Sequence, residues 1–313
     1  MTDNVVTVKE MKKYFNFEQI TGDEHSLNRE IVIADTNRPG LELAGYFDYS
    51  QKKRIIVLGD KEIEYIKIMA EVAQRKSFDF LTSLETPMII ISKKHDCPKL
   101  LRDIAIQKNF PILRSIQKTS QLITNMISYL DERLAPMDCY HAVLLSINGK
   151  GVLICGESGI GKSEVALELI RRGHQLVADD RVDCYQIHNN IVGMAPAILQ
   201  GFLELRGVGV IDVERMYGAN STLPRANIDV VVELKPWDMN ANYDRVGIEE
   251  TKYKTILDVQ IPKITLPVRE GRSMGIVIES AVANIVLKEK GFDSGKEFEE
   301  RVLQSIKLQN GGE

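Results

Sequence analysis

One eight-residue stretch constrains the fold more than any other part of the chain. "GESGIGKS" (residues 156–163) fits G-x-x-x-x-G-K-[ST] and stands between the apolar run "GVLIC" and the helical pattern "KSEVALELIRR". A strand, a glycine-rich loop and a helix in this order aim backbone N–H groups at an anion, and the helix N-terminus adds positive potential. A glycine-rich turn that only caps a helix is the alternative. Glycines at 156, 159 and 161 favour the phosphate-binding loop.

The residue types inside this loop indicate nucleotide chemistry. Lys162 is expected to reach the β- and γ-phosphates, and the Ser163 hydroxyl to hold Mg²⁺. The phosphates themselves are expected to lie against the whole loop: Gly156, Glu157, Ser158, Gly159, Ile160, Gly161, Lys162 and Ser163. The chain is therefore predicted to bind ATP together with Mg²⁺.

Two acidic residues follow the loop after one short helix and one short strand. The helix that starts at Lys162 carries the chain about 16 Å away from the loop at a rise of about 1.5 Å per residue. The strand "HQLVAD" returns about 20 Å, and a right-handed crossover makes it parallel to the first strand. Asp179 and Asp180 should then lie beside the phosphates on opposite faces, one near Mg²⁺ and the other as a proton acceptor. The alternative is an ordinary acidic turn paired with Arg181.

A hairpin precedes the loop and adds a histidine to the expected site. "YHAVLLSINGKGVLIC" holds two apolar runs around Asn148-Gly149-Lys150-Gly151, which is a hairpin signal. Counting back along an antiparallel ladder sets His141 opposite Gly156 or Ser158. We expect His141 either to pair with one of the aspartates or to donate a hydrogen bond to a loop carbonyl.

Composition excludes several classes of function. A net charge of −4 argues against a nucleic-acid partner, which usually requires a strongly basic face. No signal peptide and no membrane-spanning run is visible, so we expect a soluble, cytoplasmic protein. The cysteines lie far apart with no C-x-x-C pair, which predicts free thiols rather than a zinc site or disulfides: Cys97, Cys139, Cys155 and Cys184.

The 313 residues suit two domains. The first half alternates β-branched runs (29–35, 54–59 and 87–92) with helical patterns (62–76 and 97–108), which predicts a small α/β layer. Its His25 and His95 are expected at the surface. A long amphipathic helix over 115–136 ends at a proline. We therefore place an N-terminal α/β domain at residues 1–133 and a catalytic domain at 134–313.

Four ordered motifs make the sequence resemble the bacterial HPr kinase/phosphorylase family. They are "GESGIGKSEVALELIRRGHQLVADD", "LELRGVGVID" (203–212), "YDRVG" (243–247) and "LPVREGRS" (266–273). The resemblance implies a catalytic domain with a phosphate-binding loop, similar to phosphoenolpyruvate carboxykinase. It implies a kinase that uses ATP or pyrophosphate to phosphorylate a serine of HPr, the phosphocarrier protein of the sugar phosphotransferase system. It also implies phosphorolysis of that phosphoserine by inorganic phosphate, which releases pyrophosphate.

Further properties follow only from the resemblance. They are a homohexamer, a response to fructose 1,6-bisphosphate, and a role in carbon catabolite repression and sugar uptake. The resemblance makes Asp180 the base of the forward reaction and the acid of the reverse, His141 and Lys162 catalytic, and Glu204 a magnesium ligand beside Ser163 and Asp179. Arg245 matches an arginine needed for phosphate removal. A loop tied to the same half-reaction covers Leu266, Pro267, Val268, Arg269, Glu270 and Gly271.

The sequence departs from the family pattern at a few positions. Ala142 stands where the family usually has glycine, and Glu270 replaces a common proline, which adds negative charge to the phosphorolysis loop.

The sequence leaves two other functions open. The phosphate-binding loop alone is also compatible with a kinase for a small metabolite. A non-enzymatic module that ATP switches between binding states would also contain such a loop. The acid pair beside the loop favours an enzyme.

Overall fold

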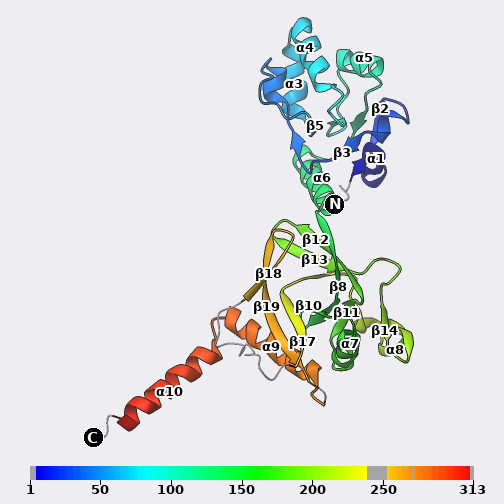
Figure 1. The fold of residues 1–313 in the computed structure, drawn as a ribbon. Helices are drawn as coiled ribbons and strands as arrows, with labels where there is room; N and C mark the ends of the chain where they lie inside the picture. Colours follow the sequence, from blue (N-terminus) through cyan, green and yellow to red (C-terminus); the bar gives the residue numbers. More distant parts are fainter. Residues whose placement is uncertain (1–4, 238–251, 270, 311–313) are drawn as a thin grey trace. The chain divides into compact units, whose positions relative to one another are not determined.

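The computed structural model describes residues 5–237, 252–269 and 271–310 (Figure 1). The chain divides into two compact units, Met1–Pro136 and Met137–Glu313, and each is treated by itself. No helix in the described ranges combines the length and the apolar character that crossing a bilayer requires.

The first unit is built on a five-stranded sheet in the order β2-β7-β6-β5-β4. Strands β4 to β7 run parallel, and β2 pairs antiparallel with β7 at the edge. The strands of this unit are β1 (Val6–Thr7), β2 (Glu18–Thr21), β3 (Glu30–Ile31), β4 (Thr36–Asn37), β5 (Ile55–Leu58), β6 (Ile89–Ile91) and β7 (Ile112–Arg114). The helices are α1 (Val8–Phe15), η1 (Ser26–Asn28), α2 (Gly40–Leu43), α3 (Asp60–Ile68), α4 (Glu71–Leu81), α5 (Lys99–Gln107) and α6 (Thr119–Arg133).

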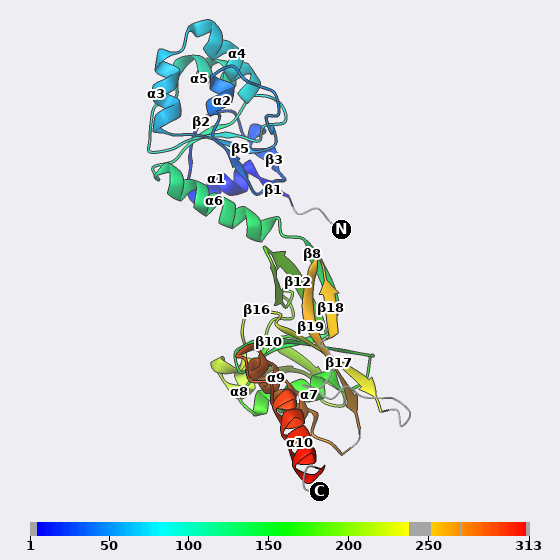
Figure 2. The same cartoon turned by 90° about the vertical axis from the view of Figure 1, so that its left-hand side faces the viewer.

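Helices cover both faces of this sheet (Figure 2). Alternate strand residues point to opposite faces, so Ile56 and Leu58 pack against α2, α3, α4 and α5. Ile55 and Val57 pack against α1 and α6 on the other face. Because both faces are buried, the central strands are continuously apolar, which is typical of a parallel sheet. The predicted α/β layer is confirmed.

Two predictions for the first half were wrong in detail. The run 29–35 forms only the two-residue strand β3, which pairs with β1 outside the main sheet. The pattern 62–76 forms two helices rather than one, because Met69 and Ala70 adopt extended backbone angles (ψ 141° and 144°) and break the hydrogen-bond ladder. Hydrophobic periodicity alone does not register such a break, since Ile66 and Phe78 still face the same core.

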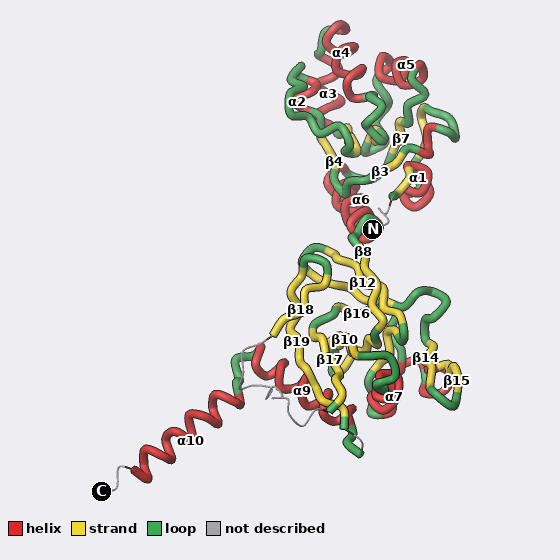
Figure 3. Tube along the Cα trace, viewed as in Figure 1, coloured by secondary structure: helices red, strands yellow, loops and turns green. Residues whose placement is uncertain are grey.

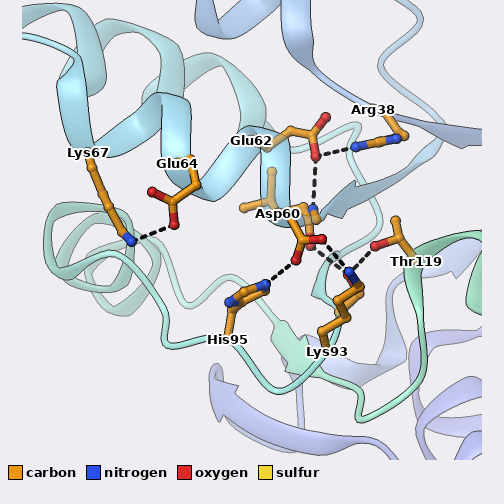
Figure 4. A network of polar contacts seen from close by, with 11 residues as sticks. Arg38, Asp60, Glu62, Glu64, Lys67, Lys93, His95 and Thr119 are labelled. Carbon is orange, nitrogen blue, oxygen red and sulfur yellow. Dashed lines mark hydrogen bonds and ion pairs between the residues drawn. The ribbon is translucent and has the colours of Figure 1, made fainter.

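Polar side chains gather where the parallel strands of the first unit end (Figure 4). Asp60 opens α3, and its carboxylate pairs with Lys93 and with His95 Nε2, the latter at 2.6 Å. Arg38 pairs with Glu62 at 2.7 Å. His95 is thus a partly exposed ion-pair partner, and His25 is exposed.

The second unit contains two main sheets and a hairpin. A six-stranded sheet has the order β11-β9-β10-β17-β19-β18, a four-stranded sheet has the order β16-β13-β12-β8, and β14 pairs with β15. The strands are β8 (Met137–His141), β9 (Val143–Ile147), β10 (Lys150–Gly156), β11 (Gln175–Ala178), β12 (Arg181–Ile187), β13 (Asn190–Met194), β14 (Phe202–Leu205), β15 (Gly209–Asp212), β16 (Ala226–Asn227), β17 (Val230–Pro236), β18 (Lys252–Ile256) and β19 (Val259–Val268). The helices are α7 (Lys162–Arg171), α8 (Val213–Tyr217), η2 (Ala219–Ser221), α9 (Met274–Glu289) and α10 (Ser294–Asn310).

The six-stranded sheet is the central layer of this unit (Figure 3). Val152 and Ile154 of β10 pack on one face against Leu169 of α7 and Ile278 of α9. Leu153, from the opposite face of β10, packs against the four-stranded sheet. Strand β10 is therefore buried on both sides, which holds the loop that follows it rigidly at the edge of the layer.

Strand order decides how the chain returns to the phosphate-binding loop. Strand β11 runs parallel to β10, as predicted, but it does not lie beside it. Both pair antiparallel with β9, which lies between them. Three parallel strands, β10, β17 and β19, end at the same edge, where Gly156 pairs with Leu234 and Leu234 with Leu266. The carboxyl edge of this parallel group is the place where ligands bind in open α/β sheets.

Candidate active site

The phosphate-binding loop leads from β10 into α7 as the sequence predicts. Gly159 and Gly161 have φ of 85° and 98°, left-handed values that a side chain would make costly. Lys162 is only 6% exposed, and its Nζ donates to the carbonyl oxygens of Gly156 at 3.1 Å and Glu157 at 3.2 Å. The loop therefore folds around the lysine ammonium group at the start of the helix.

The two aspartates at the end of β11 lie in opposite environments. Asp179 is 4% exposed, and its carboxylate accepts hydrogen bonds from Ser163 Oγ at 3.0 and 3.2 Å and from the backbone N–H of Glu204 at 3.0 Å. Burial raises the pKa of the Asp179 carboxyl above its ordinary value, although these hydrogen bonds act in the other direction. The Asp180 side chain is 63% exposed, and its backbone has a positive φ of 66°.

His141 connects Asp180 to the lysine of the loop. Its Nδ1 lies 3.0 Å from Asp180 Oδ1 and 3.0 Å from the Asp180 carbonyl oxygen. Both neighbours are acceptors, so Nδ1 carries the hydrogen and donates it. The other ring nitrogen, Nε2, lies 3.2 Å from Lys162 Nζ and accepts from it. Of the two expectations for His141, the structure favours the pairing with an aspartate.

The ladder count that brought His141 near the loop was wrong. The β9–β10 hairpin turns at Asn148 and Gly149 as expected, but its ladder stops at the pair Val143 and Ile154. The chain leaves the sheet at this point, and His141 ends β8 in the other sheet, opposite Arg181. His141 still reaches the loop, because β8 ends beside Asp180 and β12 begins there.

The Arg181 side chain does not form the ion pair expected in the alternative interpretation of the acid pair. Its Nε contacts Asp183 Oδ1 at 2.8 Å, and its backbone N–H donates to the Asp179 carbonyl oxygen, also at 2.8 Å. Both aspartates face one pocket of about 250 Å³. The pocket is lined by His141, Ser158, Gly159, Gly161, Lys162, Ser163, Glu164, Asp179, Asp180, Glu204 and Arg206.

Some predicted site residues do not line this pocket. Ile160 packs against the core, while Leu266 is buried in it and Val268 packs on it. Pro267 continues β19 in register with β17, and Gly271 follows the end of that strand. The Arg269 guanidinium lies 5.4 Å from the centre of the Trp237 ring. Arg245 and Glu270 lie outside the described residues.

Glu164 and Arg206 were not predicted as pocket residues. Glu164 occupies the first turn of α7 directly after the loop. Arg206 lies in the turn directly after β14, two residues beyond Glu204. Contacts between distant segments bring Arg206 to the pocket, so no local sequence pattern indicates its place there.

Comparisons with known proteins agree across both units. Residues 6–130 match the family model described as "HPr Serine kinase N terminus", and residues 132–302 match "HPr Serine kinase C-terminal domain". The HPr kinase/phosphorylases of Bacillus cytotoxicus and Bacillus cereus are each 40% identical over 306 residues, covering 97% of this chain and 98% of theirs. The HPr(Ser) kinase/phosphatase of Coxiella burnetii, a solved structure, is 36% identical over 51% of this chain and 98% of its own, with a TM-score of 0.47. The resemblance in the sequence is thereby confirmed, and the chain belongs to the HPr kinase/phosphorylase family of enzymes.

Proposed function

We propose that this chain transfers a phosphoryl group from ATP or pyrophosphate to a serine of HPr, and removes it again with inorganic phosphate. The observation that supports this most is the single pocket that holds the phosphate-binding loop, the Lys162 ammonium group and the Asp180 carboxylate. In the forward direction the bond between the γ-phosphorus and the bridging oxygen breaks, and a bond to the seryl oxygen forms. The hydroxyl proton passes to Asp180.

The environment of Asp180 suits a group that takes up and returns a proton. Its exposed carboxylate is open to an incoming hydroxyl, and the His141 Nδ1–H at 3.0 Å holds it in place. The Asp179 side chain is buried and that of Asp180 is exposed, so one chain segment supplies two carboxylates with different surroundings. By microscopic reversibility, a protonated Asp180 would protonate the seryl oxygen as it leaves in the reverse reaction.

Oxygen ligands for Mg²⁺ come from three elements that meet at the pocket. The donor set is Ser163 Oγ, the Asp179 carboxylate and the Glu204 carboxylate; the first two lie 3.0 Å apart, and the Glu204 backbone contacts Asp179. No group of three or more His, Cys, Asp or Glu side chains in the described ranges forms a cation site by itself. This fits Mg²⁺, which is commonly bound through one or two carboxylates with water and substrate phosphates. When bound, the ion would neutralise charge on the phosphates.

Phosphorolysis requires inorganic phosphate to approach the phosphoserine from the side that the nucleotide phosphates occupy in the forward reaction. Residues 266–268 form the carboxyl end of β19, two strands away from the strand that carries the phosphate-binding loop, and Arg269 and Gly271 come after it. We propose that this segment and Arg245 hold the incoming phosphate, since guanidinium groups such as that of Arg269 match phosphate oxygens.

The wider biological assignments are also part of the proposal. They are assembly as a homohexamer, control by fructose 1,6-bisphosphate, a cytoplasmic location, and a role in carbon catabolite repression and sugar uptake. Their support is membership of the family, and each can be tested separately from the chemistry.

One assay separates the proposed function from its rivals. The purified chain is mixed with γ-labelled ATP, Mg²⁺ and HPr, and then inorganic phosphate is added. We expect label on an HPr serine in the first step and labelled pyrophosphate in the second. Label on a small metabolite but not on HPr would identify a metabolite kinase. Tight ATP binding without transfer to any acceptor would identify a regulatory module.

A further inference from the structure

Helix α9 is held at its N-terminus by a side chain from another helix. Ser273 is the N-cap, and its hydroxyl oxygen accepts from the backbone N–H of Ile276 at 3.4 Å. The N–H of Gly275 donates instead to Glu168 Oε2 of α7 at 3.0 Å, and the Ser273 hydroxyl donates to Glu168 Oε1. The first N–H groups of a helix have no partner within it, and a negative charge near them is favourable. One carboxylate of α7 therefore caps α9.

Gly275 makes this close contact possible. A Cβ atom built on Gly275 would lie 2.7 Å from Cδ and 2.9 Å from Oε1 of Glu168. Glycine destabilises a helix relative to alanine. Here the carboxylate occupies the space that an alanine side chain would need. The start of α9 is thus shaped for contact with Glu168 rather than for the stability of the helix alone.

Glu168 lies between the two segments that are proposed to hold phosphate. It belongs to the helix that begins at the phosphate-binding loop, about 7.5 Å along the axis from Ser163 at a rise of about 1.5 Å per residue. Its partner Ser273 follows the segment proposed to hold inorganic phosphate. Because α7 is a continuous helix over this length, the phosphate-binding loop fixes the position of Glu168. Glu168 in turn fixes the start of α9.

The chain between β19 and α9 contains two arginines, Arg269 and Arg272. The Arg272 backbone N–H donates to the Arg269 carbonyl oxygen at 3.3 Å, so the two residues lie close together. Before them, the chain is fixed by the ladder between β19 and β17, in which Val268 is the last residue. After them, it is fixed by the contact of Ser273 with Glu168. Loss of the Glu168 carboxylate would therefore free the side of the segment that leads into α9.

We propose that Glu168 is a positioning residue for phosphorolysis: through Ser273 and Gly275 it holds Arg269 and Arg272 where inorganic phosphate binds. This inference deepens the proposed function and rests on it. In this role the carboxylate contacts neither phosphate nor the reacting atoms, and no step of the transfer passes through it. Phosphorylation by ATP requires no inorganic phosphate, so that direction should depend much less on Glu168.

Three variants distinguish this role from general support of the fold. Glu168→Ala removes both contacts. Glu168→Gln is the conservative variant, since its amide oxygen can accept from Gly275 and its amide nitrogen can donate to the Ser273 hydroxyl oxygen. Glu279→Gln is the matched control, because Glu279 also joins α9 to α7, through Arg172 at 2.7 Å, but lies beyond the first turn of α9.

The readouts are the KM for inorganic phosphate in phosphorolysis and kcat for phosphorylation by ATP. We expect Glu168→Ala to raise the KM for phosphate about tenfold or more, because a displacement of about 1 Å can cost on the order of 100-fold. Its phosphorylation rate should stay close to that of wild type. Glu168→Gln should restore most of the phosphate affinity, and Glu279→Gln should resemble wild type. An unchanged KM in Glu168→Ala would overturn the assignment, as would an equal loss of phosphorylation or an equal rise of KM in Glu279→Gln.

A second readout requires neither HPr nor phosphate. Amide hydrogen exchange reports local opening of the backbone. Exchange over residues 271–276 should be faster than in wild type in Glu168→Ala, and also in Gly275→Ala, where the added Cβ displaces the carboxylate. Exchange equal to that of wild type would refute the positioning role even if the protein catalyses phosphorolysis. If wild type removes no phosphate from HPr, the proposed function and the role of Glu168 in phosphorolysis are both wrong, whereas faster exchange would still show that Glu168 holds α9.

Discussion

Asp179 and Asp180 are neighbours in the sequence, but the Asp179 side chain lies in the protein interior and the Asp180 side chain lies at the surface. Asp179 is held inside the protein by Ser163 and by the Glu204 backbone, and burial raises its pKa. Asp180 is open to water and contacts His141. A cation in the pocket stabilises a buried carboxylate most, because burying the negative charge alone is costly. An exposed carboxylate exchanges protons readily. This difference is the physical basis for assigning them separate roles.

The buried carboxylate should lower the stability of the metal-free protein at neutral pH. Its pKa is higher in the folded state, so as pH rises the unfolded chain loses its proton first and the free energy of unfolding falls. Asp179→Asn removes this effect and can keep both hydrogen bonds. We expect the thermal midpoint of the variant at pH 7 with a chelator to exceed that of wild type.

Two controls complete this test. The difference between Asp179→Asn and wild type should narrow as pH falls toward the ordinary range of carboxyl groups. Asp180→Asn should leave the midpoint unchanged, because the side chain is exposed and asparagine tolerates a positive φ. A lower midpoint for Asp179→Asn in metal-free buffer would mean that the protein stabilises the Asp179 carboxylate more than water does.

Residue identity alone was enough to predict the loop and the acid pair, because their chemistry is local. Lys162, Ser163, Asp179 and Asp180 all line one pocket. Arg206 was missed since an arginine between a strand and glycines is usually solvated, and only the position of Gly159 distinguishes it. The roles assigned to these side chains stay predictions until variants are measured.

At the scale of elements, the β9–β10 hairpin is the support on which the loop depends. Gly151, just after its turn, donates its N–H to Asp229 Oδ2 at 2.7 Å and accepts from the Asp229 backbone at 2.8 Å. A Cβ at this position would lie 1.6 Å from the carbonyl oxygen of Asn227. Backbone rather than a flexible side chain occupies the space, so the neighbouring strand β16 would have to move.

Gly151→Ala should therefore destabilise the second unit by about 3 kcal/mol, at the upper end of what overpacking usually costs. Urea unfolding followed by a probe in this unit measures the loss. Gly40→Ala is the matched control: Gly40 opens α2 in the first unit, and no atom lies within 4 Å of its added Cβ. A Gly151→Ala variant as stable as Gly40→Ala would show that β16 yields without cost.

Elements with strong local signals were predictable, whereas their pairing was not. The hairpin, the helix after the loop and the strands at 54–59 and 87–92 follow from turn residues and periodicity. The ladder count for His141 failed because β8 belongs to a different sheet from β9, although only Ala142 separates them. The residue types do not reveal this change of sheet, since no glycine or proline lies between Met137 and Ile147.

At the scale of the whole molecule, each unit has its own buried cores. The cores of the first unit draw only on its own helices and sheet, and those of the second unit only on residues after Met137. A length of 313 residues and a helix ending at a proline were enough to expect two domains. The order of strands in the central sheet was not predictable, because β10, β17 and β19 are joined by contacts between distant segments.

We propose that one acidic side chain beside the phosphate-binding loop, that of Asp180, serves both phosphoryl transfer to HPr and removal of the phosphoryl group from HPr. The most direct test compares wild type with Asp180→Asn for phosphorylation of HPr by ATP and for phosphorolysis of phosphoserine-HPr, with ATP binding measured on the same samples. We predict that Asp180→Asn loses about 100-fold or more in both rates, the scale of general acid–base catalysis, while it still binds ATP. Near-normal transfer by Asp180→Asn in either direction would contradict the account.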